Sequence, residues 1–354
     1  MASRRAIIAG GAGALAMLSY FAWDRGLFSG PAGAPKGKCS KHTDSLRAAE
    51  AATLQFSPKD IVTRDGTRLR TGVFEAAAPC KVCALLSGQG EFIEKYVEVI
   101  GELNTRGYTV ATFDWRGQGG SSRPLADPLK AHVRDFAEYD DDLASFFDQI
   151  VKPISSEPPL VLAHSLGAHL LLRTLHAKTG IFRAAALTAP MIALSTRGYP
   201  LWMVRTVPAV YDALGESDDF AWGMADKDPL KVDFDHQICT GDRGRYARTQ
   251  TIIAHKPWLR LAGPTWGWIA AVNRSMAEVT APGYAEAIST PILFAAAGHD
   301  RVAVTEVGRR FAKRLPHCAY TELKDAQHEI LMERDFIRAQ YWQAFDGFVA
   351  RTGG

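Results

Sequence analysis

The stretch PLVLAHSLGAHLLLRTLH, residues 159–176, constrains the fold more than any other part of the chain. It begins as a continuous apolar run, which is typical of a strand covered on both faces, and continues with leucines at helical spacing. A strand that passes directly into a helix requires small residues around the turn. Ala163 and Gly167 lie two positions before and after Ser165.

This arrangement matches the nucleophile elbow GxSxG, with Ala163 in place of the first glycine. The motif predicts that Ser165 lies at the end of a buried strand and at the amino end of a helix, where the helix dipole favours an anion. The alternative is an ordinary strand-to-helix turn with a solvent-exposed serine.

Further apolar runs alternate with helical stretches on both sides of the elbow. Strands that alternate with helices predict an α/β fold with a mostly parallel sheet and right-handed crossovers, and such sheets bind ligands at the carboxyl ends of their strands. The apolar runs are residues 81–88, 108–114, 183–190 and 291–298, the helical stretches include 92–107 and 136–151, and a hairpin with an Asp65-Gly66 turn covers 60–74.

The alternation is interrupted between residues 191 and 287, where no strand can be found and aromatic residues are frequent. Because strand spacing resumes at Pro291, this segment is better interpreted as a helical insertion than as a separate domain. The predicted organisation is an N-terminal apolar segment plus linker at 1–40, a core at 41–190 and 288–354, and a helical cap at 191–287.

Composition excludes several classes of function. The chain has 354 residues, 47% of them hydrophobic, which suffices for one large globular domain with an insertion. A net charge of +3 without a basic block argues against a nucleic-acid partner. Cys80 and Cys83 lack a second pair or the histidines of a zinc site, so no metal and no cofactor are predicted, and the disulfide state of the five cysteines is left open.

A serine becomes a strong nucleophile only when a base accepts its proton and a carboxylate orients that base. Asp300 follows the apolar run 291–298 directly, so it is expected in a loop at the carboxyl end of a strand. His328 lies in a short loop between a strand-like and a helical stretch. The order Ser165, Asp300, His328 is the chain order expected for an elbow of this kind.

Other candidates for the acid and the base are weaker. Glu306 falls inside a helical stretch and is expected on the surface. His164 precedes Ser165 on an extended segment, so its side chain is expected on the opposite side. His299 neighbours the proposed acid, and His317 lies before the last strand.

Acyl transfer also needs hydrogen-bond donors for the oxyanion of the tetrahedral intermediate. The first predicted donor is the backbone N–H of Leu166, directly after the nucleophile. The second is the backbone N–H of Gln89 in SGQGEF, residues 87–92, where two glycines allow the chain to turn inward. A plain tight turn is the alternative for this loop.

The motifs LLSGQGEFIEKY, FDWRGQGGS, AHSLGAH, GHDRV and QHEILMERD together resemble the α/β-hydrolase superfamily. Within it they resemble the monoacylglycerol lipase and bacterial lysophospholipase group. The resemblance covers about residues 55–350, and residues 239–272 look particularly like the bacterial lysophospholipases. The chain departs from the group at Ser87, where a histidine is usual, and at Ala163, where a glycine is usual.

This resemblance implies a serine hydrolase that cleaves carboxylic esters of single-chain lipids through an acyl-enzyme on Ser165, with His328 and Asp300 completing the triad. It also implies that the helical cap forms an acyl-binding pocket. Cap residues expected to bind substrate are three aromatic residues along the acyl chain and basic residues at a phosphate: Trp202, Trp266 and Trp268, and Arg243, Arg245 or Arg248. For the arginines, a solvated helix face is the alternative.

Two other functions stay open. A cap-dependent aminopeptidase of the proline iminopeptidase kind would use the same triad but needs an acidic pocket, and no clear acidic cluster is found in the cap. A non-catalytic, membrane-tethered binding protein on a hydrolase fold is disfavoured by the complete triad. The head group, the acyl chain length and the oligomeric state are not predicted.

The N-terminal segment bears on location. Arg4 and Arg5 precede an uncharged apolar stretch, residues 6–23, that is just long enough to span a membrane. The start also resembles a twin-arginine export signal, whose cleavage is left open. A membrane-anchored or exported protein, in a bacterial inner membrane or periplasm, is therefore favoured over a cytoplasmic one, with an apolar arm packed on the protein as the remaining alternative.

Overall fold

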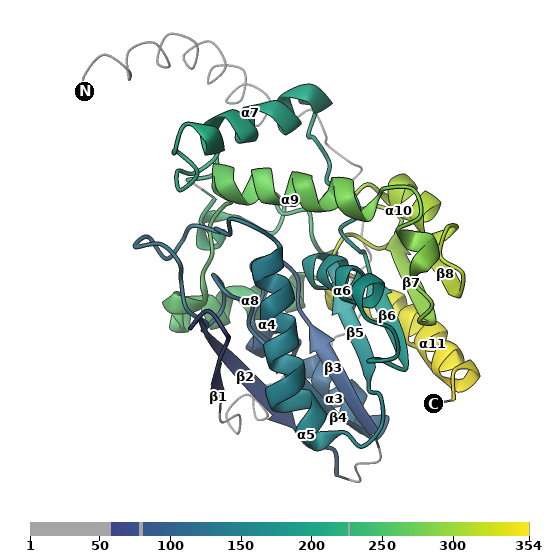
Figure 1. Ribbon diagram of the computed structural model, residues 1–354. Coiled ribbons are helices and arrows are strands. Elements are labelled where there is room, and N and C mark those ends of the chain that lie inside the picture. Colours follow the sequence, from purple (N-terminus) through teal and green to yellow (C-terminus); the bar gives the residue numbers. More distant parts are fainter. Residues whose placement is uncertain (1–57, 78–80, 226, 354) are drawn as a thin grey trace, which may run out of the picture.

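The computed structural model describes residues 58–77, 81–225 and 227–353 (Figure 1). The predicted anchor or export signal at 1–40 lies outside the described residues. Within the described residues, no helix is both long enough and apolar enough to cross a membrane.

The centre of the molecule is an eight-stranded sheet in the order β1-β2-β4-β3-β5-β6-β7-β8. The first two strands form the expected hairpin, with Gly66 at φ +85° in its turn, and all pairs from β4 to β8 are parallel. The predicted α/β fold with a mostly parallel sheet is confirmed. The strands are β1 (Lys59–Val62), β2 (Arg68–Phe74), β3 (Lys81–Leu86), β4 (Tyr108–Phe113), β5 (Leu160–His164), β6 (Ala184–Thr188), β7 (Ile292–Ala297) and β8 (Cys318–Leu323).

Both faces of the sheet are covered by helices, which explains the continuous apolar runs. Along β3, Ala84 and Leu86 pack into the core on one face while Cys83 and Leu85 pack into the core on the other. One layer holds α4 (Ala137–Phe146), the π-helical turn η2 (Phe147–Val151), α5 (Lys152–Ile154), α6 (Ser165–Ala177) and α10 (Thr305–Ala312), and the other holds η1 (Ile93–Tyr96), α3 (Val97–Thr105), η6 (Ile330–Met332) and α11 (Asp335–Arg351).

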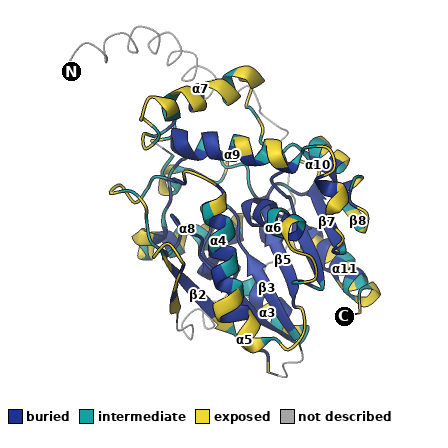
Figure 2. Cartoon of the chain, viewed as in Figure 1, coloured by how far each residue is buried: buried dark blue, intermediate teal, exposed yellow. Residues whose placement is uncertain are grey.

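Residues 191–287, which we name the cap segment, connect β6 to β7. In Figure 1, α7 lies over α9, whereas α8 lies apart from this pair. Helix α8 packs against η1 of the core, and Figure 2 shows that α7 is largely exposed while α9 is largely buried. The helices are α7 (Leu201–Ala213), η3 (Pro229–Lys231), α8 (Arg243–His255), η4 (Pro257–Leu259), α9 (Trp266–Val279) and η5 (Ala285–Ala287).

Candidate active site

Ser165 lies at a sharp turn between a strand and a helix. β5 ends at His164, α6 begins at Ser165, and Ser165 has a φ of +48°, a left-handed conformation that is strained for a residue with a side chain. A Cβ atom at Gly167 would lie 2.6 Å from the backbone oxygen of Ser87, so only glycine fits there. The buried strand, the sharp turn at Ser165 and the helix predicted for residues 159–176 are all present in the structure.

Three side chains from three different loops are hydrogen-bonded in series. The Oγ of Ser165 lies 2.8 Å from Nε2 of His328, whose Nδ1 lies 2.8 Å from Oδ2 of Asp300. Oδ1 of Asp300 accepts hydrogen bonds from the backbone N–H groups of Val302 and Ala303. Asp300 follows β7 and His328 follows β8, so neighbouring strand ends bring the three residues together.

A proton on Nδ1 of His328, directed at the carboxylate of Asp300, leaves Nε2 free to accept the hydroxyl proton of Ser165. The side chains of His328 and Asp300 are 6% and 2% exposed, so water competes little for these hydrogen bonds. The arrangement can therefore activate a serine hydroxyl for attack on a carbonyl carbon.

The alternative candidates are placed elsewhere, with one correction. Glu306 forms surface ion pairs with Arg309 and Arg310 on α10. His164 does not contact the hydroxyl of Ser165, yet its ring lies 5.0 Å from the ring of His328 instead of on the opposite side. The reason is the left-handed turn at Ser165, which interrupts the alternation of the strand. Burial lowers the pKa of His164 to about 4, and its Nδ1 faces the backbone oxygen of Thr188.

The loop that carries Gln89 is held in place by side chains of its surroundings. The amide of Gln118 donates to the oxygen of Gly88 and accepts from the N–H of Gly90, at 3.0 and 2.9 Å. Within the described chain, no hydrogen bond is donated by the intervening N–H of Gln89. Leu166 is the second residue of α6, where a helix offers its N–H groups no acceptor. Both N–H groups therefore remain candidates for the oxyanion donors.

Two buried ion pairs connect this loop to the loop of His328, and the sequence analysis did not identify them. The ammonium of Lys95 lies 2.8 Å from Glu91 and 2.7 Å from Glu329, the residue after His328. Glu91 also accepts a hydrogen bond from the N–H of Gly88. Burial alone would raise the pKa of Glu91, but Lys95 lowers it to about 2. The i,i+4 spacing of Glu91 and Lys95 was the only signal in the sequence.

A cavity of about 330 Å³ lies between this loop and the cap segment. Gln89 and Glu329 lie in its wall, so it adjoins the residues that flank the candidate catalytic groups. Much of the wall is apolar, formed by residues of the Gln89 loop, of α8 and η4, of the segment after η4 and of η6: Phe92, Tyr246, Ile253, Leu259, Leu261 and Met332.

The three tryptophans expected to bind substrate do not line this cavity. Trp202 lies on the outer face of α7 and is 67% exposed. Trp266 is buried against Tyr211, with ring centroids 4.5 Å apart, and Trp268 is buried against Phe136. Trp266 and Trp268 therefore pack α9 onto α7 and onto the core, whereas Trp202 is left on the surface.

The arginines expected at a phosphate are bound to carboxylates instead. Arg243 lies on the surface, paired with Asp235. Arg245 does line the cavity, but its guanidinium is buried and forms ion pairs with Glu98, Asp242 and Asp335. Arg248, the third candidate, also pairs with Glu98. Arg245 and Arg248 are thus already paired with carboxylates of the protein, whereas Arg243 lies on a solvated helix face, which was the alternative.

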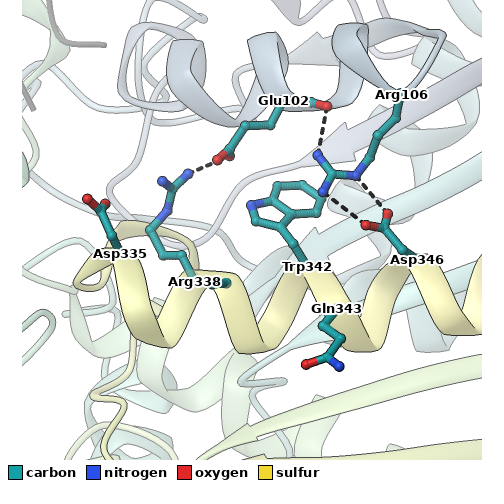
Figure 3. Close-up of a pocket in the computed structure, with 8 residues that line it drawn as sticks. Glu102, Arg106, Asp335, Arg338, Trp342, Gln343 and Asp346 are labelled. Carbon is teal, nitrogen blue, oxygen red and sulfur yellow. Dashed lines mark hydrogen bonds and ion pairs between the residues drawn. The ribbon is translucent and has the colours of Figure 1, made fainter. Parts of the chain in front are cut away.

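A larger cavity of about 590 Å³ lies between α3 and α11, and its lining includes none of Ser165, His328 and Asp300 (Figure 3). Four of its charged groups form two ion pairs, Arg338 with Glu102 and Arg106 with Asp346, while Asp335 is paired with Arg245. Trp342 lies between these pairs. In the described part of the chain, no group of three or more His, Cys, Asp or Glu side chains is arranged to hold a metal ion.

Comparison with known proteins gives consistent matches. A model of the family described as serine aminopeptidase S33 matches residues 77–335. Lysophospholipase L2 of Escherichia coli strain K12 is 32% identical over 286 residues, which cover 78% of this chain and 83% of the relative. A probable lysophospholipase L2 of Haemophilus influenzae is 24% identical over 269 residues, covering 76% of this chain and 83% of that protein.

Solved structures share the fold at lower sequence identity. The monoacylglycerol lipase of Paleococcus ferrophilus superposes with a TM-score of 0.61 at 20% identity, covering 80% of this chain and 98% of that one. A soluble variant of the monoglyceride lipase of Saccharomyces cerevisiae, solved with a substrate analogue, gives a TM-score of 0.63 at 17% identity. The match covers 84% of this chain and 96% of that one.

Proposed function

The chain belongs to the serine aminopeptidase S33 family of α/β-hydrolases, and from this premise we propose that it is a serine hydrolase that cleaves carboxylic esters of single-chain lipids. The observation that carries the proposal is the hydrogen-bonded series Ser165, His328, Asp300 beside a largely apolar cavity. The lysophospholipase relatives, of which the first is 32% identical, support an ester of a lipid as the substrate.

In the proposed reaction, Oγ of Ser165 attacks the ester carbonyl carbon while Nε2 of His328 takes the hydroxyl proton. Asp300 orients the imidazole and stabilises its positive charge. The N–H groups of Leu166 and Gln89 donate to the oxyanion of the tetrahedral intermediate. His328 then protonates the leaving alcohol, which leaves the acyl group on Ser165, and a water molecule activated by His328 releases the fatty acid.

The cavity favours an acyl chain over the amino terminus of a peptide. Its volume of about 330 Å³ and its apolar wall suit one hydrocarbon chain. An aminopeptidase would need a carboxylate to bind the free amine, and among the described lining residues the carboxylate is Glu329. This group is already paired with Lys95 at 2.7 Å, so it is a poor ligand for a second cation.

We further propose that the enzyme takes its substrate from a lipid surface. Helix α7 and the residue that follows it expose four large apolar side chains, a surface suited to the boundary between lipid and water. The apolar N-terminal stretch at residues 6–23 would add a second attachment. The exposed fractions are 52% for Leu201, 67% for Trp202 and 50% for Val210 on α7, and 57% for Leu214 directly after it.

The direct test replaces the nucleophile. Ser165→Ala in the full chain should reduce hydrolysis of lysophosphatidylcholine, monoacylglycerol and p-nitrophenyl butyrate by about 10⁴-fold or more, because the acyl-enzyme cannot form. A fluorophosphonate probe should label the wild type and fail to label His328→Ala. Retention of full esterase activity by Ser165→Ala would contradict the proposal, and the ranking of the three substrates identifies the head group.

A further inference from the structure

The segment that follows His328 contains a fully buried carboxylate, Glu333, which the proposed reaction does not use. Glu333 lies five residues after His328 and has an exposed fraction of 0%. Its nearest cation is Nε of Arg334, at 3.7 Å. A carboxylate this deeply buried is costly unless hydrogen bonds replace its hydration, so its partners indicate its role.

Backbone N–H groups provide those hydrogen bonds. Oε1 of Glu333 accepts from the N–H of Gln327 and from the N–H of Gly241, both at 2.9 Å, and Oε2 accepts from the N–H of Arg334 at 3.0 Å. Gln327 directly precedes His328, and Gly241 belongs to the cap segment. One carboxylate therefore joins the peptide before the candidate base to a peptide of the cap segment.

The peptide on the other side of His328 is held by the same part of the cap segment. The N–H of Glu329 donates to the oxygen of Cys239 at 2.7 Å. Two further bonds fix the end of the loop: Oγ1 of Thr240 donates to the oxygen of Met332, and Nη1 of Arg245 donates to the oxygen of Glu333. Backbone N–H groups on both sides of His328 are therefore tied to residues 239–241. The N–H of Gln327 is tied through Glu333, which also binds Gly241, and the N–H of Glu329 donates directly to Cys239.

We propose that Glu333 is a positioning residue for His328, and that residues 239–241 of the cap segment, acting through it, keep the imidazole in line with Ser165. The inference rests on the proposed function, because it assigns Glu333 a role in that reaction. Attack by Ser165 requires the 2.8 Å contact with His328, and a displacement of about 1 Å can reduce a rate about 100-fold. Movement of this part of the cap segment would then change the rate of the chemical step.

The first test removes the carboxylate. Glu333→Ala should lower kcat for p-nitrophenyl butyrate by about 10- to 100-fold and leave KM within about 2-fold, because the base and not the substrate is displaced. Labelling by the fluorophosphonate should slow in parallel. Glu333→Gln keeps the shape and an oxygen for Gln327 and Gly241, so it should recover most of the lost kcat. An unchanged kcat in Glu333→Ala, or a raised KM alone, would overturn the proposal.

The second test approaches from the cap segment and does not depend on whether Glu333→Ala folds. A Cβ at Gly241 would lie 3.0 Å from Oε2 of Glu333 and 3.1 Å from Nε of Arg334, so Gly241→Ala should push on the carboxylate and lower kcat several-fold. Gly267→Ala is the matched control. A Cβ at Gly267 would be similarly crowded, at 2.9 Å from His132, but Gly267 has no hydrogen bond to the loop of His328 among the described residues. It should leave kcat unchanged.

Equal effects of Gly241→Ala and Gly267→Ala on kcat would reduce the role of Gly241 to general packing and contradict the inference. A wild-type enzyme without esterase activity would instead contradict the proposed function. An active wild type with an unaffected Glu333→Ala would contradict only the role of Glu333, so the two failures are distinguishable.

Discussion

Two parts of the cap segment are attached to the core by different forces. Helix α8 is attached by ion pairs that meet at Glu98 of α3, whose side chain is 10% exposed. Its carboxylate binds Arg245 and Arg248 of α8 and Arg338 of α11. Burial alone would raise the pKa of Glu98, but the hydrogen bonds from Arg245 and the charges of the arginines lower it to about 2. Arg338 also pairs with Glu102, which extends this network into the cavity between α3 and α11 (Figure 3).

Helices α7 and α9 are attached by aromatic packing in addition to hydrogen bonds such as those of Asn273 with Val204 and of Ser275 with His169. Trp266 of α9 stacks on Tyr211 of α7 at 4.5 Å and contacts Trp222 edge-on at 5.1 Å. Below them, Trp268 packs on Phe136 of the core. The outer face of α7 is exposed, as Figure 2 shows.

The difference corresponds to the two tasks of the cap segment in the proposed function. Ion pairs and hydrogen bonds are directional, so they hold the α8 part at one position beside the cavity and the loop of His328. Apolar packing is non-directional and tolerates displacement, which suits the α7 part at a lipid surface. We therefore expect charge changes near α8 to affect catalysis and apolar changes on α7 to affect contact with lipid.

The largest effect is expected for Glu98→Ala, which leaves Arg245, Arg248 and Arg338 without their shared carboxylate. The free energy of unfolding should fall by about 3–5 kcal/mol in urea denaturation followed by circular dichroism. Asp346→Ala is the control, because its ion pair with Arg106 is exposed and should contribute about 0–1 kcal/mol. Equal losses in the two variants would show that the ion pairs at Glu98 do not hold α8.

Trp266→Ala should have the next largest effect, about 3 kcal/mol, since it removes a buried ring and its contacts with Tyr211 and Trp222. Hydrogen exchange should show reduced protection in α7 and α9 and unchanged protection in α8. Uniform loss of protection over all three helices would mean that the two parts are one cooperative unit.

pH should separate the two kinds of attachment. The pKa of Glu98 in the folded protein, about 2, is below its ordinary value of 4.5, so the stabilisation is complete above pH 4.5 and is lost as the pH falls toward 2. The stability difference between wild type and Glu98→Gln should therefore shrink over this range. The difference between wild type and Trp266→Ala should stay constant, and a parallel decrease for both variants would contradict this assignment.

The smallest effect on stability is expected for Trp202→Ser, within about 0.5 kcal/mol, because the side chain is exposed. Sedimentation with phosphatidylglycerol-containing vesicles should nevertheless decrease, as should hydrolysis of monoacylglycerol in those vesicles, while hydrolysis of p-nitrophenyl butyrate stays unchanged. Trp258→Ser is the matched control, since Trp258 is 60% exposed in η4. Equal decreases in both variants would argue against a specific lipid contact of α7.

Residues close in sequence were predicted with most success. The strand pattern, the hairpin and the turn at Ser165 follow from local hydrophobicity, small residues and turn chemistry. Asp300 and His328 were selected by their positions after predicted strands, and they lie in hydrogen-bond contact with each other and with Ser165. The partners of Arg245 could not be predicted, because Glu98 belongs to no motif that marks it as a partner; separation alone is not the obstacle, since Ser165 and His328 are 163 residues apart.

The sequence by itself determined the order of strands and helices and the left-handed turn that presents a serine, because backbone conformation and burial on both faces depend on neighbouring residues. Only the tertiary structure decided which cations are already paired, which tryptophans pack inside, and that Glu333 joins the cap segment to the loop of His328. These features depend on charges and N–H groups from distant segments that become neighbours only when the chain folds. A hydrophobicity pattern does not predict which of them will pair.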